Sequence, residues 1–176
     1  MIESISSYGY SLMAIAYLQH IHMIPSLQRL HSGPPIICKV LQPDLQRKGK
    51  KQLNTREVNV SFATNAIHLV VAPNLVWSSD GVPGVFYGFM KYFAEEYEYF
   101  PTTHVCIKQG GIIFNQDCMP KNRRARLVVR DPFEQERNCT SSVDDSLALI
   151  IKEFSRACTI IESGANFETI FQKISR

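Results

Sequence analysis

The stretch DGVPGVFYGFMKYFAEEYEYFP, which spans residues 80–101, gives the clearest structural signal in the sequence. Asp80 suits the N-cap of a helix, Pro83 suits its first turn, and Pro101 stops it. Its apolar residues recur three and four positions apart, as on the buried face of an amphipathic helix. They are Val85, Phe86, Phe89, Met90, Phe93 and Tyr97. The stretch therefore predicts a long helix that packs its apolar face on a core.

Two further helices are predicted, one on each side of this stretch. Ser6 and Ser7 can cap a helix that runs to about residue 20, with apolar residues crowded on one side. Another helix is predicted from residues 140–142 to Gly164, because its apolar residues again follow helical spacing. These apolar residues are Val143, Leu147, Ile150, Phe154, Cys158 and Ile161. After Gly164, Asn166 is predicted to cap a last short helix.

Extended structure is predicted mainly in the second half of the chain. Residues 104–107 and 112–114 flank Gly110 and Gly111, a pattern that is typical of a β-hairpin. Residues 126–129 are a third strand candidate, and residues 58–62 alternate between apolar and polar side chains as a short strand does. The sequence thus predicts a helix-dominated α+β fold with a small sheet late in the chain.

The composition is that of one globular domain. The chain has 176 residues, which is enough for a hydrophobic core. Of these residues 45% are hydrophobic and 20% are charged, a composition that argues against a disordered chain. Its net charge of +3 does not by itself require an anionic partner. Basic residues gather at 39–56 and 121–130, where they could line a phosphate-contacting groove, although solvated loop surface is the favoured interpretation. Residues 43–57 are polar and aperiodic and predict a surface loop.

Cysteine and histidine patterns give no metal site. The five cysteines include no pair with CxxC spacing, which is typical of a reduced intracellular protein without a zinc knuckle or a disulfide framework. The histidines form no HExxH motif, and His20 and His22 are interpreted as structural. The apolar run 12–18 is too short to span a bilayer, so no membrane partner is predicted.

The sequence also has no self-contained catalytic motif. It has no GxGxxG, no phosphate-binding P-loop and no GxSxG. It has no pair of aspartates one residue apart on a predicted strand, the arrangement that two-metal phosphoryl transfer requires. Periodicity and motifs therefore predict a fold without naming an activity.

Three segments resemble one family, the terminal uridylyltransferases and their cytoplasmic-type poly(A) polymerase relatives. ISSYGYSLM at 5–13, with YLQ at 17–19 and IPSLQ at 24–28, is similar to the family's serine–tyrosine helix start and the motifs after it. SSDG at 78–81 and GFMKYFA at 88–94 resemble the family's GELLLGFFKYYA helix. RDPFE at 130–134, followed by Asn138, resembles its EDPF motif and later asparagine. The resemblance implies that residues 1–176 are one partial central, substrate-binding domain, with the poly(A)-polymerase-associated segment at about 80–143.

The resemblance also implies a nucleotide-binding site. Ser7 would contact the triphosphate at a helix N-terminus, and Tyr8 would stack on the base. Asp131 and Glu134 match acidic residues near the base edge, where they accept hydrogen bonds from the base or from neighbouring donors. Arg137 stands where many uridylyltransferases carry a uracil-favouring histidine, which leaves the choice between UTP and ATP open. The residues alone permit plainer roles: a helix cap, a buried ring, a turn aspartate and an exposed glutamate.

The implied function is the addition of UMP or AMP to RNA 3′ ends without a template. The family's Mg²⁺ or Mn²⁺ ions are held by aspartates of a preceding catalytic domain that nothing here matches, so the chain is expected to be inactive alone. The implied partners are an RNA 3′ end, a nucleoside triphosphate and a protein cofactor, in the cytoplasm rather than the nucleus. Two alternatives stay open, a non-catalytic scaffold relative and an unrelated helical binding domain. The second would be rejected if Tyr8 and Asp131 met across one cleft.

A partial domain is also expected to leave apolar surface uncovered. The helix near Ser6 and the helix over 85–97 would each keep an apolar face that a missing part normally covers.

Overall fold

The computed structural model describes residues 4–42, 54–64, 81–99, 101–114, 125–143 and 145–171, and the structural statements below concern these residues. Their fold is α+β, as the sequence predicts. In chain order the elements are α1 (Ser7–His20), β1 (Ile37–Gln42), β2 (Asn54–Asn59), α2 (Gly81–Lys91), η2 (Tyr92–Glu96), β3 (Thr103–Cys106), η3 (Ile107–Gln109), β4 (Gly111–Phe114), α3 (Leu147–Glu162) and η4 (Phe167–Phe171).

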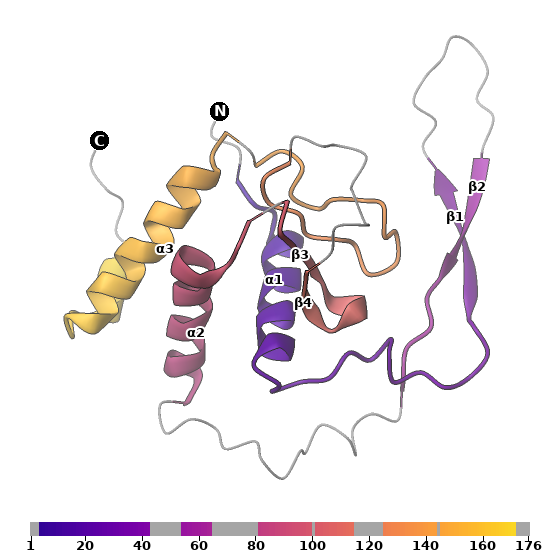
Figure 1. The fold of residues 1–176 in the computed structure, drawn as a ribbon, viewed down its shortest axis with the longest axis horizontal. Helices are drawn as coiled ribbons and strands as arrows, with labels where there is room; N and C mark the ends of the chain where they lie inside the picture. Colours follow the sequence, from indigo (N-terminus) through magenta and orange to yellow (C-terminus); the bar gives the residue numbers. More distant parts are fainter. Residues whose placement is uncertain are drawn as a thin grey trace.

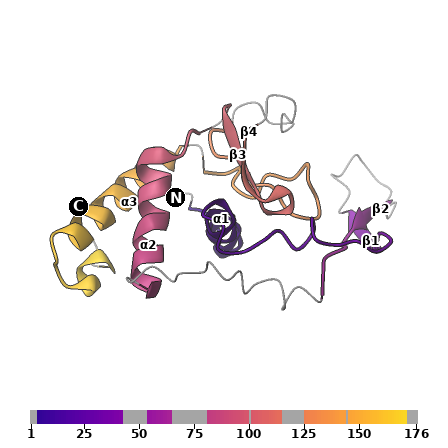
Figure 2. The ribbon, with the colours of Figure 1, turned by 60° about the horizontal axis from the view of Figure 1, so that its bottom comes forward.

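Helix α1 lies at the centre of the molecule. Figures 1 and 2 show it between α2 on one side and the hairpin of β3 and β4 on the other. It begins as predicted, because the Ser6 hydroxyl accepts a hydrogen bond from the Gly9 amide at 3.1 Å. Leu12, Met13 and Ala16 are buried on its inner side. Helix α1 therefore forms the central element against which α2 and the β3–β4 hairpin lie.

The helix predicted over 80–97 changes type before it ends. It is α-helical to Lys91 and continues as the π-helical turn η2, in which the Tyr97 amide donates to the Tyr92 carbonyl at 2.8 Å. The wider turn brings Tyr92, Phe93 and Tyr97 into the core, where each is at most 8% exposed. The predicted N-cap, Asp80, lies outside the described residues.

The predicted hairpin is confirmed. β3 and β4 are antiparallel, with Val105 opposite Ile112, and the short 3₁₀ turn η3 lies between them. Gly110 and Gly111 have φ of 101° and 114°, in the region that favours glycine. Gly111 also lies against α1, because a Cβ added there would be 2.7 Å from the carbonyl oxygen of Ala16. The two glycines thus serve both the turn and the contact with α1.

The third strand predicted over residues 126–129 does not form. Only isolated bridges occur, between Val105 and Val129 and between Arg130 and Asn138. The reason is that the Val129 amide donates to the side-chain oxygen of Asn138 at 3.0 Å instead of to a neighbouring strand. Residues 125–132 are nevertheless almost all buried, so this segment is a core segment without a ladder.

Helix α3 begins later than predicted. The sequence places its start at residues 140–142, whereas it starts at Leu147. Thr140 is fully buried, and its hydroxyl donates to the Leu127 carbonyl at 2.8 Å, which holds residues near it in turns. Gly164, with φ of 69°, ends the helix as expected, and the Asn166 side chain accepts from the Glu168 amide at 3.0 Å at the start of η4.

The ribbon of β1 and β2 was only partly predicted. β1 was not predicted at all, and β2 covers residues 54–59, so the strand predicted over 58–62 begins earlier and ends earlier. Residues 54–57 therefore belong to a strand and not to the predicted surface loop, whose remaining residues 43–53 lie outside the described residues. Figure 1 shows the ribbon at the opposite side of the molecule from α3.

Two further observations concern the described part of the chain. None of its helices is long and apolar enough to cross a membrane. Its four cysteines, Cys38, Cys106, Cys139 and Cys158, are free thiols. Apolar surface remains exposed at Tyr8 on α1 and at Val82 on α2, where only Met90 is fully buried.

Candidate nucleotide-binding site

The N-terminal end of α1 carries the first two predicted site residues. Ser6 takes the role of helix cap, so Ser7 is the first helical residue, and it is exposed. The first amide N–H groups of a helix have no partner within it and favour an anion, aided by the helix dipole. Ser7 therefore combines an exposed hydroxyl with the free donors of the helix start.

Tyr8 lies beside this helix start and is held by its hydroxyl. The Tyr8 hydroxyl donates to Oδ2 of Asp131 at 3.2 Å, across 123 residues of sequence. Partial burial, and then the adjacent Asp131 carboxylate, raise the pKa of Tyr8 to about 12. The side chain is still 45% exposed, so its ring is accessible while its hydroxyl is fixed. The buried-ring alternative for Tyr8 is therefore wrong.

Asp131 is a buried residue whose two carboxylate oxygens are both engaged. It is 7% exposed. Its Oδ1 accepts from the amides of Phe133 and Glu134 at 2.8 and 2.9 Å, and its Oδ2 accepts from Tyr8. The carboxylate thus closes a turn and orients Tyr8, and the donors it serves are neighbouring protein groups.

Glu134 and Arg137 complete a closed loop, which we call the 131–137 loop. The Arg137 amide donates to the Glu134 carbonyl at 2.8 Å, and the Asp131 amide donates to the Arg137 carbonyl at 3.1 Å. The Arg137 side chain is exposed, and its positive charge opposes the rise in the Tyr8 pKa. Burial and Asp131 raise the pKa of the neighbouring Cys139 thiol to about 11.

Gln135 supports this loop and is identified only by the structure. The Gln135 side chain donates to the Asp131 carbonyl at 2.6 Å, and its Oε1 lies 3.3 Å from Sγ of Cys106 on β3. No local sequence signal marks Gln135, because its partners are set by tertiary contact. Asn138, named from the sequence, has a structural role, since its amide nitrogen donates to the Leu127 carbonyl at 3.1 Å.

The structure thus brings the five predicted residues to one end of α1. Tyr8 and Asp131 touch directly, Ser7 precedes Tyr8 at the helix start, and the 131–137 loop carries Glu134 and Arg137. Their direct contact argues against an unrelated helical domain. No group of three or more His, Cys, Asp or Glu side chains that could hold a metal ion exists within the described residues.

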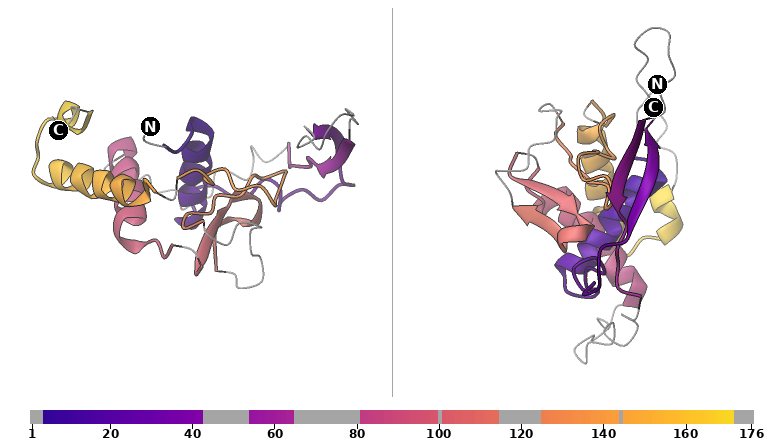
Figure 3. Two further views of the ribbon diagram at one scale, coloured as in Figure 1. Left: turned by 90° about the horizontal axis from the view of Figure 1, so that it is seen from above. Right: turned by 90° about the vertical axis from the view of Figure 1, so that its right-hand side faces the viewer.

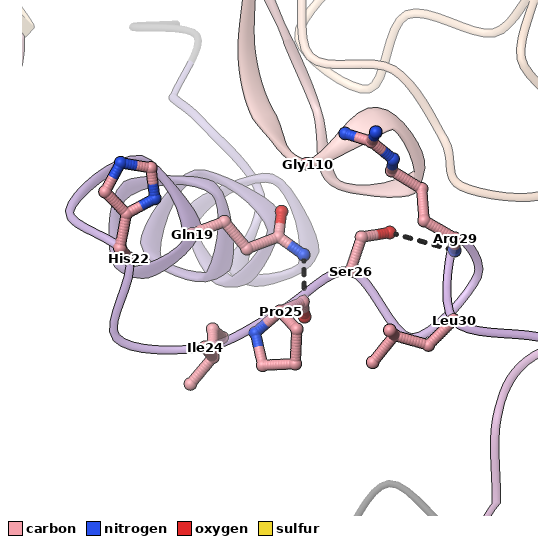
Figure 4. Close-up of a pocket in the computed structure, with 8 residues that line it drawn as sticks. All are labelled: Gln19, His22, Ile24, Pro25, Ser26, Arg29, Leu30 and Gly110. Carbon is pink, nitrogen blue, oxygen red and sulfur yellow. Dashed lines mark hydrogen bonds between the residues drawn. The ribbon is translucent and has the colours of Figure 1, made fainter. Parts of the chain in front are cut away.

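A separate open cleft of about 440 Å³ lies at the opposite, C-terminal end of α1 (Figure 4). Gln19, His22, Ser26 and Arg29 supply its polar lining, with Ile24 and Leu30 among its apolar residues. Gln19 donates to the Pro25 and Ile107 carbonyls at 3.3 and 3.1 Å, so its amide nitrogen is already engaged. His20, next to this cleft, packs its ring on Tyr92 with centroids 4.7 Å apart, a structural role as predicted.

Comparison with solved structures identifies the fold. No family model matches the sequence, and a search of curated proteins finds no match. The chain is similar in fold to about half of the solved structure of an RNA terminal uridylyltransferase. The likeness confirms the fold that the resemblance of the three sequence segments implies.

The matched structures are those of named uridylyltransferases. Cid1, studied for its RNA terminal uridylyl transferase activity, aligns at 23% identity with a TM-score of 0.64, covering 98% of this chain and 50% of Cid1. A cytoplasmic RNA terminal U-transferase aligns at 23% identity with a TM-score of 0.67, covering 99% and 49%. Cid1 in complex with the UTP analogue UMPNPP aligns at 24% identity with a TM-score of 0.65, covering 98% and 51%. The chain therefore spans about half the length of the structures it matches.

Proposed function

We propose that this chain forms one wall of the nucleotide site in a template-independent nucleotidyltransferase that adds UMP or AMP to RNA 3′ ends. The main support for this proposal is the hydrogen bond between Tyr8 and Asp131, which holds the exposed Tyr8 side chain beside the start of α1. The likeness of fold to Cid1 bound to a UTP analogue supports the proposal, as does Cid1 bound to Mg and 3′-dATP.

The proposed roles follow from what each group can offer. The Ser7 hydroxyl and the first amides of α1 would receive the triphosphate, since a helix start is a natural anion site. The Tyr8 ring would stack on the base, a contact worth about 1–3 kcal/mol that any base can make. Asp131 would act through Tyr8 as a positioning residue, because both of its oxygens are already engaged.

Arg137 is proposed to read the base. An arginine side chain carries only hydrogen-bond donors. Uracil presents the O4 acceptor where adenine presents its N6 amino donor, so a guanidinium that met this position of the base would favour UTP over ATP. Glu134, which is half-buried and precedes Arg137 in the same loop, can help to orient that guanidinium.

Divalent metal ions are implied by the fold but not by these residues. Because the described part of the chain holds no cluster of three metal-binding side chains, Mg²⁺ or Mn²⁺ would have to be held elsewhere in a complete enzyme. The metal would supply charge stabilisation to the transferred phosphoryl group. The chain by itself is therefore proposed to bind nucleotide weakly and to lack transferase activity. By analogy with the cytoplasmic relative we place the complete protein in the cytoplasm.

The decisive experiment is 3′-end extension of a short labelled RNA, with Mn²⁺ and each of the four nucleotides in turn. It compares this chain with the same chain joined to a catalytic domain carrying a Gly-Ser loop and paired aspartates. Activity confined to the joined protein, highest with UTP, would support the proposal. Tyr8→Ala should lower kcat/KM about tenfold or more, whereas Ser142→Ala, an exposed control, should not.

A second arm tests Arg137 against the histidine of many family members. Arg137→His should change the ratio of kcat/KM for UTP and ATP without changing the melting temperature, because the side chain is exposed. No extension in any combination, together with retained RNA or protein binding, would instead support the non-catalytic scaffold.

A further inference from the structure

Gln135 joins the 131–137 loop to the buried strand β3. Its side-chain nitrogen donates to the Asp131 carbonyl at 2.6 Å, and its Oε1 accepts from the Cys106 thiol at 3.3 Å. Each group meets a partner of the matching kind, because an amide nitrogen donates hydrogen bonds and an amide oxygen accepts them. The side chain is half-buried, and it reaches from the loop to the strand with both of its polar groups engaged.

The strand end of this bridge belongs to the core. Cys106 is 0% exposed and is the last residue of β3, where it pairs with Gly111 of β4. Burial raises the pKa of the Cys106 thiol, which therefore keeps its proton and can donate to Gln135. Figure 3 shows the orange segment of residues 125–143 beside both α1 and the hairpin of β3 and β4. The loop is thus held from the hairpin as well as from α1.

The loop end of the bridge is the backbone of Asp131. The Asp131 amide donates to the Arg137 carbonyl at 3.1 Å, and its Oδ1 accepts from the Phe133 and Glu134 amides. These three bonds join residues of the loop to one another, so they set its shape and not its place on the core. Gln135 adds a point of attachment outside the loop, because its oxygen is bonded to β3.

The hydrogen bond of Tyr8 depends on where the Asp131 carboxylate lies. The Tyr8 hydroxyl and Oδ2 of Asp131 are 3.2 Å apart, which is longer than the roughly 2.5–3.0 Å that is usual between two oxygens. A small movement of the carboxylate away from α1 would therefore break this bond. Asp131 is 7% exposed, so its carbonyl would lack a ready replacement donor if Gln135 were removed, and the backbone would shift to find one.

We propose that Gln135 is a positioning residue of the nucleotide site, which transmits the fixed position of β3 through Asp131 to the Tyr8 side chain. The nucleotide part of this inference rests on the proposed function. Gln135 does not contact the nucleotide in this role, because both of its polar groups are engaged by protein partners. Its effect passes through the Tyr8 hydroxyl, and this route distinguishes it from a residue that only stabilises the fold.

The test is a double-mutant cycle on the affinity of the chain for UTP, measured by NMR titration. Gln135→Met keeps the length of the side chain, removes its amide group and should weaken UTP binding about fivefold. In the Tyr8→Phe background the ring remains and the bond to Asp131 is already absent, so the same substitution should change the affinity by less than about 1.5-fold. An equal loss in both backgrounds would overturn the proposal, because Gln135 would then act on the fold as a whole.

Two further variants control this cycle. Gln28→Met makes the same substitution at another half-buried glutamine, in the segment that follows α1, and should leave UTP affinity unchanged. Gln135→Leu removes the same amide group with a shorter neutral side chain, and should weaken UTP binding as Gln135→Met does. It provides the measurement if the methionine variant fails to fold. Parent affinity in a folded Gln135 variant would contradict the proposal.

Nitration of Tyr8 by tetranitromethane gives a readout that needs no nucleotide. The reagent attacks the phenolate, and the Asp131 carboxylate contributes, after burial, to raising the pKa of Tyr8 to about 12. Gln135→Met should release the hydroxyl from Asp131 and speed nitration of Tyr8 about threefold or more at about pH 8, measured by mass spectrometry of its peptide. An unchanged rate would overturn the inference even if UTP binds. A raised rate together with failure of the RNA extension assay would reject the proposed function, while Gln135 would still be the residue that positions Tyr8.

Discussion

The chain contains two antiparallel two-stranded sheets whose surroundings are opposite. β3 is buried along its whole length, and its hairpin lies against α1 through Gly111. β1 has no buried side chain among its described residues. Antiparallel backbone hydrogen bonds therefore join the strands of both sheets, but only the β3–β4 hairpin is packed into the core. The comparison indicates that these hydrogen bonds define the local shape of a sheet, whereas packing against neighbouring elements determines its stability.

The most sensitive probe of this difference is the pair of cysteines, one in each sheet. Cys38 is exposed on β1, whereas Cys106 is fully buried on β3, and burial raises the pKa of the Cys106 thiol. Under native conditions we expect iodoacetamide to modify Cys38 about a thousandfold faster than Cys106, because Cys106 must wait for an opening of the core. Mass spectrometry of timed samples measures both rates. Similar rates would show that the hairpin of β3 and β4 opens as easily as the ribbon.

Gly111→Ala should produce the largest loss of stability. Its φ of 114° strains any side chain, and the new Cβ would be 2.7 Å from the Ala16 carbonyl oxygen. Strain and overpacking together should lower the free energy of unfolding by about 3 kcal/mol, measured by urea denaturation. Gly164→Ala is the matched control, because Gly164 has a φ of 69° and no atom within 4 Å of the added Cβ. It should cost about 1 kcal/mol.

The same valine-to-alanine substitution in each of the two sheets tests how much each sheet is stabilised by packing. Val105→Ala removes two methyl groups from a fully buried side chain on β3 and should cost about 2 kcal/mol. Val40→Ala makes the same change on β1, where the side chain is 39% exposed, and should change the unfolding free energy by less than about 0.5 kcal/mol. Equal costs would mean that the ribbon is packed in solution by a partner layer.

An effect of pH on stability is expected through His104 on β3. Burial first, and then the nearby Arg130, lower the pKa of His104 to about 4, against an ordinary value near 6.5. The folded state therefore favours the neutral ring. This stabilisation is complete above pH 6.5 and is lost as the pH falls from 6.5 toward 4. The urea midpoint should fall over this range less steeply in His104→Gln than in the parent chain. An unchanged slope would place His104 in contact with solvent.

Sequence reasoning succeeded where structure depends on near neighbours in the chain. The cap at Ser6, the glycines of the β3–β4 turn and the stop at Gly164 are local features, and each was predicted. It failed where a distant partner decides the outcome. Thr140 was placed in a helix, but its hydroxyl bonds to the Leu127 carbonyl and delays the start of α3.

The ribbon and the candidate site were predictable to different degrees for the same reason. Residues 37–40 of β1 are all exposed, so the alternation of buried and exposed side chains that marks a strand is absent from them. Tyr8 and Asp131 were joined by resemblance to a family and not by periodicity. The bonds from the Phe133 and Glu134 amides to Asp131 match the turn aspartate that the residues alone permit, whereas its contact with Tyr8 depends on tertiary packing that no local pattern specifies.

The hydrogen bond between Tyr8 and Asp131 cannot form during protein synthesis until the ribosome has made Asp131. The two residues are separated by 123 positions. At about 5–20 residues per second, a ribosome needs on the order of 10 s to make the chain between them. For that interval α1 lacks the loop that holds Tyr8, and for most of it α1 also lacks the β3–β4 hairpin that packs against Ala16. A nascent chain of this protein therefore carries the start of its first helix without the 131–137 loop until about three quarters of the 176 residues exist, and chaperones that bind exposed apolar helices have that interval in which to act.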